Sequence, residues 1–402
     1  AARCSVRDVG RARAMPYSNV DSVAKLIPSD INMTISKALA ISTELKKIYD
    51  TDPAVHNLLD VAMSIEGMPR HITIHAAGVV ITDRPVSDYV PLSKSDDAVV
   101  TQFTMTTLEE LGLLKMDFLG HRNLTVINDA VKMINETEDF NINTIPEDDK
   151  AVFTMMSSGN SDGVFQFESQ GMKNVLTQLK PTSIEDLIAV ISLYRPGPMD
   201  SIPKYINNRH NPSQISYAHP LLEPILNVTN GCIVYQEQVM QIFRTLAGYS
   251  LGRADIVRRA MSKKKHDVME KEKQIFIHGL LNSNGNVEVE GCLRRGVDEK
   301  TALSVFSQME SFASYAFNKS HAAAYANVAY QTAYLKCHYK KQYMAALLSS
   351  VLDNQNKMAT YISECQRLGI LVLPPHVNES QALFTVTHGN IRFGLTAIRN
   401  LG

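Results

Sequence analysis

The sequence predicts an α+β protein that is mostly helical, and three observations lead to this class. Its 402 residues exceed one average domain, and 45% hydrophobic residues are enough to bury cores, so we expect two or three packed units. The apolar/polar alternation of strands is found between residues 77 and 118 and again after residue 369. The long stretch between these two regions has mainly helical spacing.

The part before about residue 71 predicts a small helical domain. Helical patterns such as Val20–Ile27 and Ile41–Tyr49 alternate there with proline breakers, and we find no catalytic constellation. The spacing of apolar residues then changes from a helical to an alternating pattern, and we expect strands at Ala77–Ile81, Val99–Phe103 and Leu113–Phe118. Between the last two strands, Thr106–Glu109 fits a capping box and Gly112 closes a short helix. The sequence thus predicts a compact α+β unit after the first helices.

The rest of the chain is predicted to be helix-rich, with a small mixed element at its end. The expected helices are Ile184–Tyr194, Gln236–Ala247, Ala254–Met261, Ala302–Ala313 and Ser320–His338. The strand-like segments after Gly369 are Leu371–Pro375, Phe384–Val386 and Ile391–Phe393.

Composition excludes several classes of protein. Lys and Arg total 40 and Asp and Glu 41, a net charge of -1, so any nucleic-acid site must be local. No apolar run approaches the roughly 20 residues that span a bilayer, and the start has no signal-peptide pattern, so we expect a cytoplasmic protein without membrane contact. The five cysteines form no Cys-x-x-Cys pair and indicate neither a zinc site nor disulfides. With no initiator Met and an unfinished pattern at residues 393–402, we expect an internal piece of a longer protein.

A charged pair on the third predicted strand is the first candidate site. Alternation puts Lys115 and Asp117 on one face, with Leu114 and Met116 on the other. A carboxylate suits Mg²⁺ and an ammonium suits a triphosphate, so the pair fits phosphoryl transfer. For these two residues taken alone, an ordinary surface ion pair is the better interpretation.

A basic cluster at residues 253–266 is the second candidate, with six cations of Lys and Arg and one acid in fourteen residues. Arg258 and Arg259 can give forked hydrogen bonds to phosphate oxygens, and Lys263, Lys264 and Lys265 add point charges. The alternative is a solvated helix end, where cations favour the helix dipole. In a chain of net charge -1, the cluster favours an anion site.

A predicted helix start and two loops complete the candidates. Ser320 is a plausible N-cap, and His321 and Tyr325, four residues apart, share a helix face that can meet a sugar or a base. Packing of an Ala-rich helix is the alternative. The loops are residues 162–169, which contain Gln166, and residues 194–199, where prolines fix Arg195.

In this order the segments closely resemble the C-family bacterial replicases, the DNA polymerase III alpha subunits. The matching segments are Val6–Arg11, His75–Val80, Lys115–Gly120, Gly163–Glu168, Tyr194–Met199, the basic cluster and Asn318–Tyr325. A single hexapeptide is a weak signal, but their joint order is highly specific. The resemblance implies a thumb at residues 1–73, a returning palm segment of nucleotidyltransferase-like type at 74–121 and helical fingers at 122–402.

The resemblance also implies a function and site residues. The family uses three palm aspartates; Asp117 matches the third, and the paired two are expected upstream of Ala1. Lys115, Arg258 and Arg259 would contact the triphosphate of the incoming dNTP. The nucleotide pocket would further be lined by Lys263, Lys264, Lys265, Arg195, Gln166, Lys319, His321 and Tyr325. His121 departs from the family, which commonly has an apolar residue there, and leaves the turn after Asp117 open.

The implied enzyme is a DNA-directed DNA polymerase that uses two Mg²⁺ ions in DNA replication, with Asp117 as a metal ligand. Its partners would be primer–template DNA and dNTP and, through other regions, a sliding clamp, a proofreading exonuclease subunit and a clamp loader. With one of three aspartates, the chain alone is expected to be inactive. The alternatives are a non-catalytic nucleotide- or nucleic-acid-binding module and an unrelated helical interaction protein.

Overall fold

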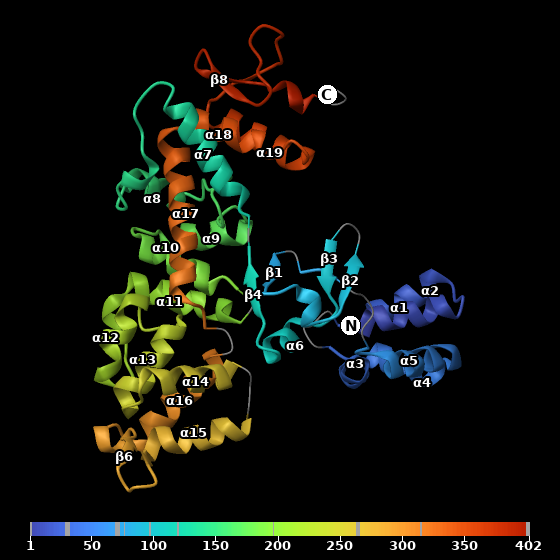
Figure 1. Ribbon diagram of the computed structural model, residues 1–402, viewed down its shortest axis with the longest axis vertical. Coiled ribbons are helices and arrows are strands. Elements are labelled where there is room, and N and C mark those ends of the chain that lie inside the picture. Colours follow the sequence, from blue (N-terminus) through green and yellow to red (C-terminus); the bar gives the residue numbers. More distant parts are fainter. Residues whose placement is uncertain are drawn as a thin grey trace. The chain divides into compact units, whose positions relative to one another are not determined.

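The structure is a computed structural model that describes residues 2–28, 33–68, 73–75, 77–95, 98–118, 120–195, 197–262, 266–313 and 316–398 (Figure 1). The chain divides into two compact units, which we call the N-terminal unit (residues 1–119) and the C-terminal unit (residues 120–402). Helices predominate over small sheets, which confirms the predicted α+β class.

Short helices around one core form the first part of the N-terminal unit. They are α1 (Ala2–Ala12), α2 (Tyr17–Lys25), α3 (Ile35–Ile41), α4 (Thr43–Thr51) and α5 (Pro53–Ile65). The hydroxyl of Ser42 accepts a hydrogen bond from the Leu45 N–H and thereby caps α4. The predicted helix Ile41–Tyr49 is therefore wrong at its start, because Ile41 is the last residue of α3. Fully buried residues of the core include Val6, Ile27, Leu45 and Leu58.

Two antiparallel strand pairs follow in the same unit. Strand β1 (Gly78–Ile81) pairs with β4 (Leu114–Asp117), and β2 (Leu92–Ser95) pairs with β3 (Ala98–Thr101). The 3₁₀ helix η1 (Val86–Asp88) precedes β2, and α6 (Met105–Glu110) lies between β3 and β4 in the sequence. The three predicted strands are confirmed, but β2 was missed because only one of its four residues is apolar. The predicted capping box is wrong, since α6 begins before Thr106; Gly112, with φ of 74°, does end the helical turn.

The C-terminal unit is built from helices. They are α7 (Arg122–Ile134), α8 (Lys150–Ser157), α9 (Gln170–Leu179), α10 (Ile184–Leu193), α11 (Ile202–His210), α12 (Glu223–Leu226), α13 (Gln236–Ala247), α14 (Leu251–Ser262), α15 (His266–His278), α16 (Glu299–Ala313), α17 (Lys319–His338), α18 (Lys340–Ser349) and α19 (Gln355–Arg367). The short 3₁₀ helices are η2 (Ile142–Thr144), η3 (Pro198–Ser201), η4 (Pro212–Gln214), η5 (Pro220–Leu222), η6 (Asn227–Thr229), η7 (Leu293–Arg295) and η8 (Leu395–Ala397). The five helices predicted in this region are confirmed to within a few residues.

Helix α17 is the centre of this unit, as Figure 1 shows. It carries alanines at positions 322, 326, 329 and 333, all fully buried, and this spacing places them on one helical face. That face packs against α10, whose residues from Asp186 to Leu193 are all buried. Small side chains let the two backbones approach closely, so the alanine face of α17 serves packing while its N-terminus is left for other contacts.

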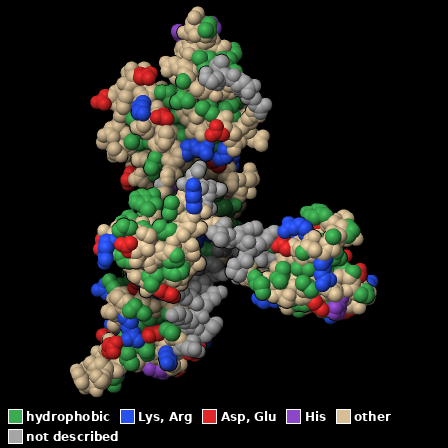
Figure 2. All heavy atoms as spheres, turned by 45° about the vertical axis from the view of Figure 1, so that its right-hand side comes forward, with side chains coloured by type: hydrophobic (Ala, Val, Ile, Leu, Met, Phe, Trp, Pro, Cys, Tyr) green, Lys and Arg blue, Asp and Glu red, His purple; other side chains and the backbone are tan. Residues whose placement is uncertain are grey.

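Small sheets complete the C-terminal unit. Strand β5 (Leu280–Leu281) pairs with β6 (Val287–Val289), and near the end β9 (Asn390–Arg392) lies between β7 (Val372–Leu373) and β8 (Thr385–Thr387). This last sheet confirms the predicted mixed element. All five cysteines are free. No helix of the described residues is both long and apolar enough to cross a lipid bilayer. On the faces seen in Figure 2, basic and acidic side chains are interspersed.

Candidate functional site

The Lys115–Asp117 pair lies on β4 in the N-terminal unit. Lys115 Nζ donates to Asp117 Oδ1 at 2.6 Å, which confirms that the two side chains share a face. The Lys115 side chain is 14% exposed and that of Asp117 48%, so the carboxylate is open to a ligand. The hydrogen bond from Lys115 is the main cause that lowers the pKa of Asp117, and partial burial opposes it.

Two further residues, which were not among the predicted site residues, complete this corner of the sheet. Gly78 pairs with Asp117 across the sheet, and a Cβ at Gly78 would lie 2.7 Å from Lys115 Cε. His75 Nδ1 accepts the Gly78 N–H at 2.7 Å and lies 3.8 Å from Asp117 Oδ1. In a neutral ring whose Nδ1 accepts, Nε2 carries the proton. Cross-strand register was the missing information, because neither residue is near Asp117 in sequence.

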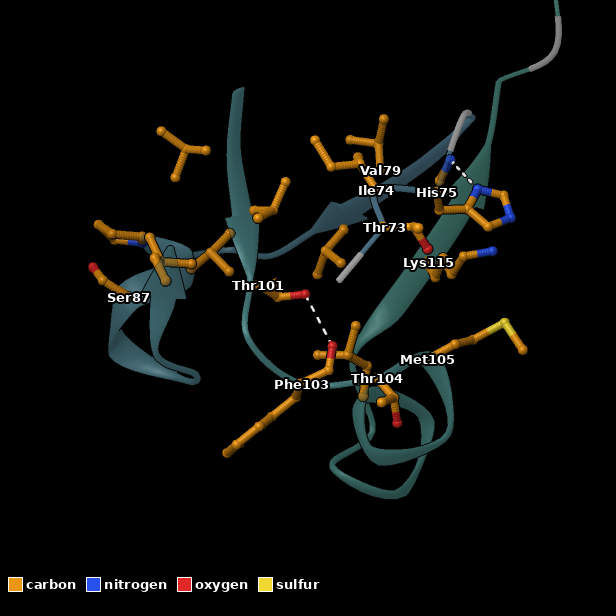
Figure 3. Close-up of a pocket in the computed structure, with 18 residues that line it drawn as sticks. Thr73, Ile74, His75, Val79, Ser87, Thr101, Phe103, Thr104, Met105 and Lys115 are labelled. Carbon is orange, nitrogen blue, oxygen red and sulfur yellow. Dashed lines mark hydrogen bonds between the residues drawn. The ribbon is translucent and has the colours of Figure 1, made fainter. Parts of the chain in front are cut away.

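The opposite face of the β1–β4 sheet is apolar and exposed. Val79 pairs with Met116 and Ile81 with Leu114, and each of these side chains is between 43% and 56% exposed. A cavity of about 620 Å³ in the same unit is lined mainly by apolar residues of β1, β3 and α6, and Lys115 also lines it (Figure 3). The described part of the N-terminal unit therefore leaves apolar surface uncovered next to its charged pair.

An aromatic row brings several predicted residues together in the C-terminal unit. The Arg195 guanidinium carbon lies 4.4 Å from the centroid of the Phe317 ring. The ring centroids of Phe317 and His321 are 5.3 Å apart, and those of His321 and Tyr325 are 4.5 Å apart. The ring of Tyr325 in turn contacts that of Phe165, with 5.3 Å between the ring centroids. We call Arg195, Phe317, His321, Tyr325 and Phe165 the aromatic row. The two phenylalanines were not selected from the sequence, because a lone Phe between loops gives no functional signal.

His121 packs against the last two residues of the aromatic row, Tyr325 and Phe165. Its Nε2 is 3.2 Å from the Tyr325 hydroxyl, and its ring meets the edges of Tyr325 and Phe165. His121 thus has a polar contact within the C-terminal unit.

The start of α17 differs from the prediction. Asn318, not Ser320, is the N-cap: its side chain accepts the His321 N–H at 2.8 Å, while Ser320 lies inside the helix. The Lys319 ammonium is 3.1 Å from a Glu185 oxygen, and the Lys319 N–H donates to Glu237. The cation of Lys319 is therefore already paired beside the exposed His321.

Gln166 lies next to Phe165 in a loop and is exposed. Its φ of 66° is in the left-handed region, which side-chain-bearing residues rarely adopt. Among the described residues its side chain has no hydrogen-bond partner. The amide group is thus displayed to solvent.

The positive charges of the basic cluster are neutralised by more acidic side chains than the sequence suggested. Arg258 donates to Asp255 Oδ1 at 2.7 and 3.0 Å, Arg259 lies 2.8 Å from Asp255 Oδ2, and the Arg258 hydrogen bond is the main cause that lowers the pKa of Asp255. Arg253 is bound by Glu272 and Glu288, which are far away in sequence. The Arg258 side chain is 13% exposed and that of Arg259 69%. Outside the described residues lie Lys263, Lys264 and Lys265.

A metal site is only partly present among the described residues, where no group of three or more His, Cys, Asp and Glu side chains converges. Asp117 supplies a half-exposed carboxylate, an oxygen ligand of the kind that Mg²⁺ prefers, and Mg²⁺ is commonly bound through one or two carboxylates with waters and phosphates. The carboxylate therefore fits as one ligand of a metal ion and not as a complete site.

Comparison with protein families gives three matches along the chain. The bacterial DNA polymerase III alpha NTPase domain matches residues 1–120, and the DNA polymerase III alpha subunit finger domain matches residues 123–284. A helix-hairpin-helix motif matches residues 369–402. The described residues 369–398 hold strands β7 to β9 and a 3₁₀ helix, and no α-helix.

Curated relatives match the whole chain. The DNA polymerase III subunit alpha of Bacillus subtilis (strain 168) is 44% identical over 405 residues, which are 100% of this chain and 35% of the relative. The proteins of the same name from Borreliella burgdorferi (44% identity, 99% of this chain, 34% of the relative) and Thermus aquaticus (43%, 100%, 33%) are similar to the same extent. The chain spans about a third of the length of these relatives.

Proposed function

Because the chain belongs to the family of bacterial DNA polymerase III alpha subunits, we propose that it forms part of the active site of a template-directed DNA polymerase. The observation that carries the proposal is Asp117, an exposed carboxylate paired with Lys115 on β4, in the segment that resembles the family's third palm aspartate. The thumb, palm and fingers boundaries at residues 73 and 121 are part of this proposal.

Asp117 would act as a ligand of a catalytic Mg²⁺. When bound, the metal would favour ionisation of the primer 3′ hydroxyl and neutralise charge on the phosphates. Lys115 holds Asp117 in place at 2.6 Å, and its ammonium would contact a phosphate oxygen bound beside that carboxylate. Gly78 keeps space for that lysine.

The aromatic row and Gln166 would line the pocket of the incoming dNTP. Aromatic rings offer flat faces to a base or a sugar, and the exposed His321 and Arg195 add hydrogen-bond donors. Gln166 offers both a donor and an acceptor. Lys319 would add positive charge, although Glu185 already balances it.

Arg258 and Arg259, with Lys263, Lys264 and Lys265, would bind the triphosphate. Arg259 is the arginine better placed for this role, because its side chain is 69% exposed and makes a single contact with Asp255. Arg258 would have to leave two hydrogen bonds to reach a phosphate. We therefore assign the larger share of phosphate binding to Arg259.

Primer–template DNA and dNTP are the proposed ligands. The sliding clamp, the exonuclease subunit, the clamp loader and the cytoplasmic location remain predictions. The alternative function is a non-catalytic nucleotide- or nucleic-acid-binding module. It is favoured because, among the described residues, no second and third metal-ligating side chains converge with Asp117.

Asp117→Asn in a full-length polymerase that carries this chain tests the proposal. The change is isosteric, so primer extension with Mg²⁺ should fall to background while the melting temperature and the affinity for primer–template stay near wild type. Asp88→Asn, at an exposed carboxylate of η1 in the same unit, is the matched control and should retain activity. Extension by Asp117→Asn at the wild-type rate would support the binding-module alternative.

A further inference from the structure

We infer that Lys336 and Glu364, a buried ion pair, are positioning residues that fix the loop of residues 160–168 and thereby present Gln166 to the incoming nucleotide. The inference rests on the proposed function, in which Gln166 contacts the nucleotide. Neither residue of the pair belongs to a segment that pointed to a site in the sequence.

The conformation of Gln166 requires support. A left-handed φ of 66° is unfavourable for a residue with a Cβ, and such residues persist where the surrounding structure fixes them. They are concentrated at active sites and ligand-binding sites. An exposed Gln with this backbone and without a partner among the described residues is therefore a candidate contact for a ligand.

The backbone on both sides of Gln166 is held by buried side chains. Thr332 Oγ1 accepts the Phe165 N–H at 3.1 Å, and the Ser161 hydroxyl donates to the Phe167 carbonyl at 2.7 Å. Both Ser161 and Thr332 are 0% exposed. The backbone polar groups immediately before and after Gln166 thus have fixed partners from inside the core.

The start of the loop is fixed in the same way. The Tyr343 hydroxyl donates to the Gly163 carbonyl at 2.5 Å, and Glu168 Oε1 accepts both the Gly163 N–H at 2.9 Å and the Tyr361 hydroxyl at 2.7 Å. Gly163 itself has a φ of 77°, and a Cβ there would lie 2.5 Å from Leu347 Cδ2. The loop therefore closes on itself through Glu168 and fits tightly against α18.

Lys336 is the central support of this arrangement. Its side chain is 0% exposed, and its ammonium donates to the carbonyls of Asn160 at 2.9 Å and Asp162 at 2.6 Å and lies 2.6 Å from Glu364 Oε1. The three N–H donors thus have three acceptors, two of them on the loop backbone. Burial lowers the pKa of Lys336, and Glu364 opposes this effect.

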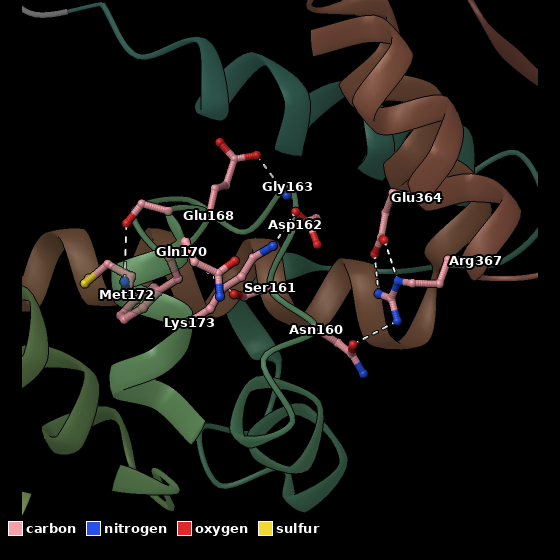
Figure 4. A network of polar contacts seen from close by, with 12 residues as sticks. Asn160, Ser161, Asp162, Gly163, Glu168, Gln170, Met172, Lys173, Glu364 and Arg367 are labelled. Atoms are coloured by element: carbon pink, nitrogen blue, oxygen red, sulfur yellow. Dashed lines mark hydrogen bonds and ion pairs between the residues drawn. The ribbon is translucent and has the colours of Figure 1, made fainter. Parts of the chain in front are cut away.

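Arg367 links the ion pair to the loop a second time. Its guanidinium donates to both carboxylate oxygens of Glu364, at 2.7 and 2.6 Å, and to Asn160 Oδ1 at 2.8 Å (Figure 4). On the other side Lys173 lies 2.6 Å from Asp162. A buried charge is costly unless it is fully paired, so this network is best explained by the loop geometry that it enforces.

The test compares variants of a full-length polymerase that carries this chain. Gln166→Gly should raise the KM for dNTP about tenfold, the scale of one lost hydrogen bond to a charged ligand, while the protein stays at least as stable, because glycine adopts the left-handed conformation freely. Lys336→Met should raise that KM by a similar factor, and the double variant should show no further increase. Thr332→Val, a milder and isosteric change, should raise it less.

Arg209→Met is the matched control, because Arg209 pairs with the buried Asp186 in the same unit and does not contact the loop. It should lower stability without a change in KM. Amide hydrogen exchange of residues 161–168 is the second readout and should become faster in Lys336→Met and Thr332→Val but not in Arg209→Met.

Unchanged loop exchange in Lys336→Met, or a KM effect that adds to that of Gln166→Gly, would overturn the positioning role. An unchanged KM in Gln166→Gly would instead overturn the nucleotide contact of Gln166. The two failures are thus distinguishable.

Discussion

Asp117 in the N-terminal unit and Gln166 in the C-terminal unit are both exposed polar residues, but they rest on different supports. Asp117 lies on a two-stranded sheet, and among the described residues its carboxylate accepts a side-chain hydrogen bond from Lys115 alone. The other face of that sheet is apolar and exposed. Gln166 lies on a loop whose neighbours are bound by buried groups such as Thr332 and Lys336.

The difference shows two ways of placing a functional group. A two-stranded sheet is marginal by itself, so the geometry around Asp117 depends on few interactions and can change at little cost in stability. The geometry around Gln166 is part of the core and cannot change without loss of stability. Substitutions at matched positions in the two units should therefore separate function from stability.

The largest effect is expected for Gly163→Ala in the C-terminal unit. A left-handed φ of 77° and a Cβ 2.5 Å from Leu347 Cδ2 both oppose the change. We expect a loss of about 2–4 kcal/mol in the free energy of unfolding, from left-handed strain and overpacking together. Urea unfolding measures it. A loss below about 0.5 kcal/mol would show that the loop is not rigid and would break the comparison.

The next effect separates two arginines of α14. Arg259→Lys keeps the charge but loses the forked geometry, so the KM for dNTP should rise about tenfold, the scale of one charge-assisted hydrogen bond. Arg258→Lys should change the KM less and the melting temperature more, because Arg258 is 13% exposed and bound twice to Asp255. If both variants had the KM of the wild type, the result would support the alternative that these arginines lie at a solvated helix end and bind no phosphate. Weaker, more salt-sensitive duplex binding with unchanged KM would favour a DNA-backbone role.

A smaller effect concerns stability against acid. Burial raises the pKa of Glu364, but hydrogen bonds from Arg367 and Lys336 outweigh burial, so the folded pKa lies below the ordinary 4.5. The carboxylate therefore stabilises the fold above about pH 4.5 and loses this contribution as the pH falls through the lowered value. Glu364→Gln should flatten the decline in stability below that pH.

In the same measurement of stability against pH, Asp117→Asn is the counterpart of Glu364→Gln in the N-terminal unit. The pKa of Asp117 is also lowered, chiefly by Lys115, but its side chain is 48% exposed. Solvent screening should leave the stability profile of this variant close to that of wild type. Chemical unfolding between pH 3 and 7 compares the two variants, and an equal flattening in both would contradict the contrast between the units.

The smallest stability effect is expected for Gly78→Ala. The added Cβ would meet Lys115 Cε at 2.7 Å, and the end of a flexible side chain can move away. The melting temperature should change little, whereas primer extension should fall because Lys115 no longer reaches Asp117. A large fall in melting temperature with unchanged activity would show that the β1–β4 sheet is more rigid than we propose.

Local patterns predicted the elements well and the contacts between elements poorly. Helix α13 has the bounds predicted from its period, and the shared face of Lys115 and Asp117 followed from strand alternation. Ser320 was predicted as the N-cap of α17, but Asn318, two residues earlier and of an equally suitable residue type, is the N-cap in the structure. The spacing of Asp255 to Arg258 and Arg259 was visible in the sequence, but the arginines were interpreted as free for a ligand.

Long-range partners gave no signal in the sequence. Glu272 and Glu288 neutralise Arg253 only after folding, and Lys336 meets Glu364 across two helices. The left-handed backbone of Gln166 was equally hidden, because such positions are expected at glycine. The difference between the well-supported loop of Gln166 and the less supported strand of Asp117 thus lies in tertiary contacts, which only the structure shows.

The central claim, that Asp117 is a ligand of the catalytic metal, is tested most directly by a change of metal preference. In Asp117→Cys the hard oxygen ligand becomes a thiolate, so extension with Mg²⁺ should be lost and should return in part with Mn²⁺ or Co²⁺, which accept sulfur more readily. Asp117→Asn should show no such recovery. Wild-type extension by Asp117→Cys with Mg²⁺, or no recovery with either metal, would contradict the claim.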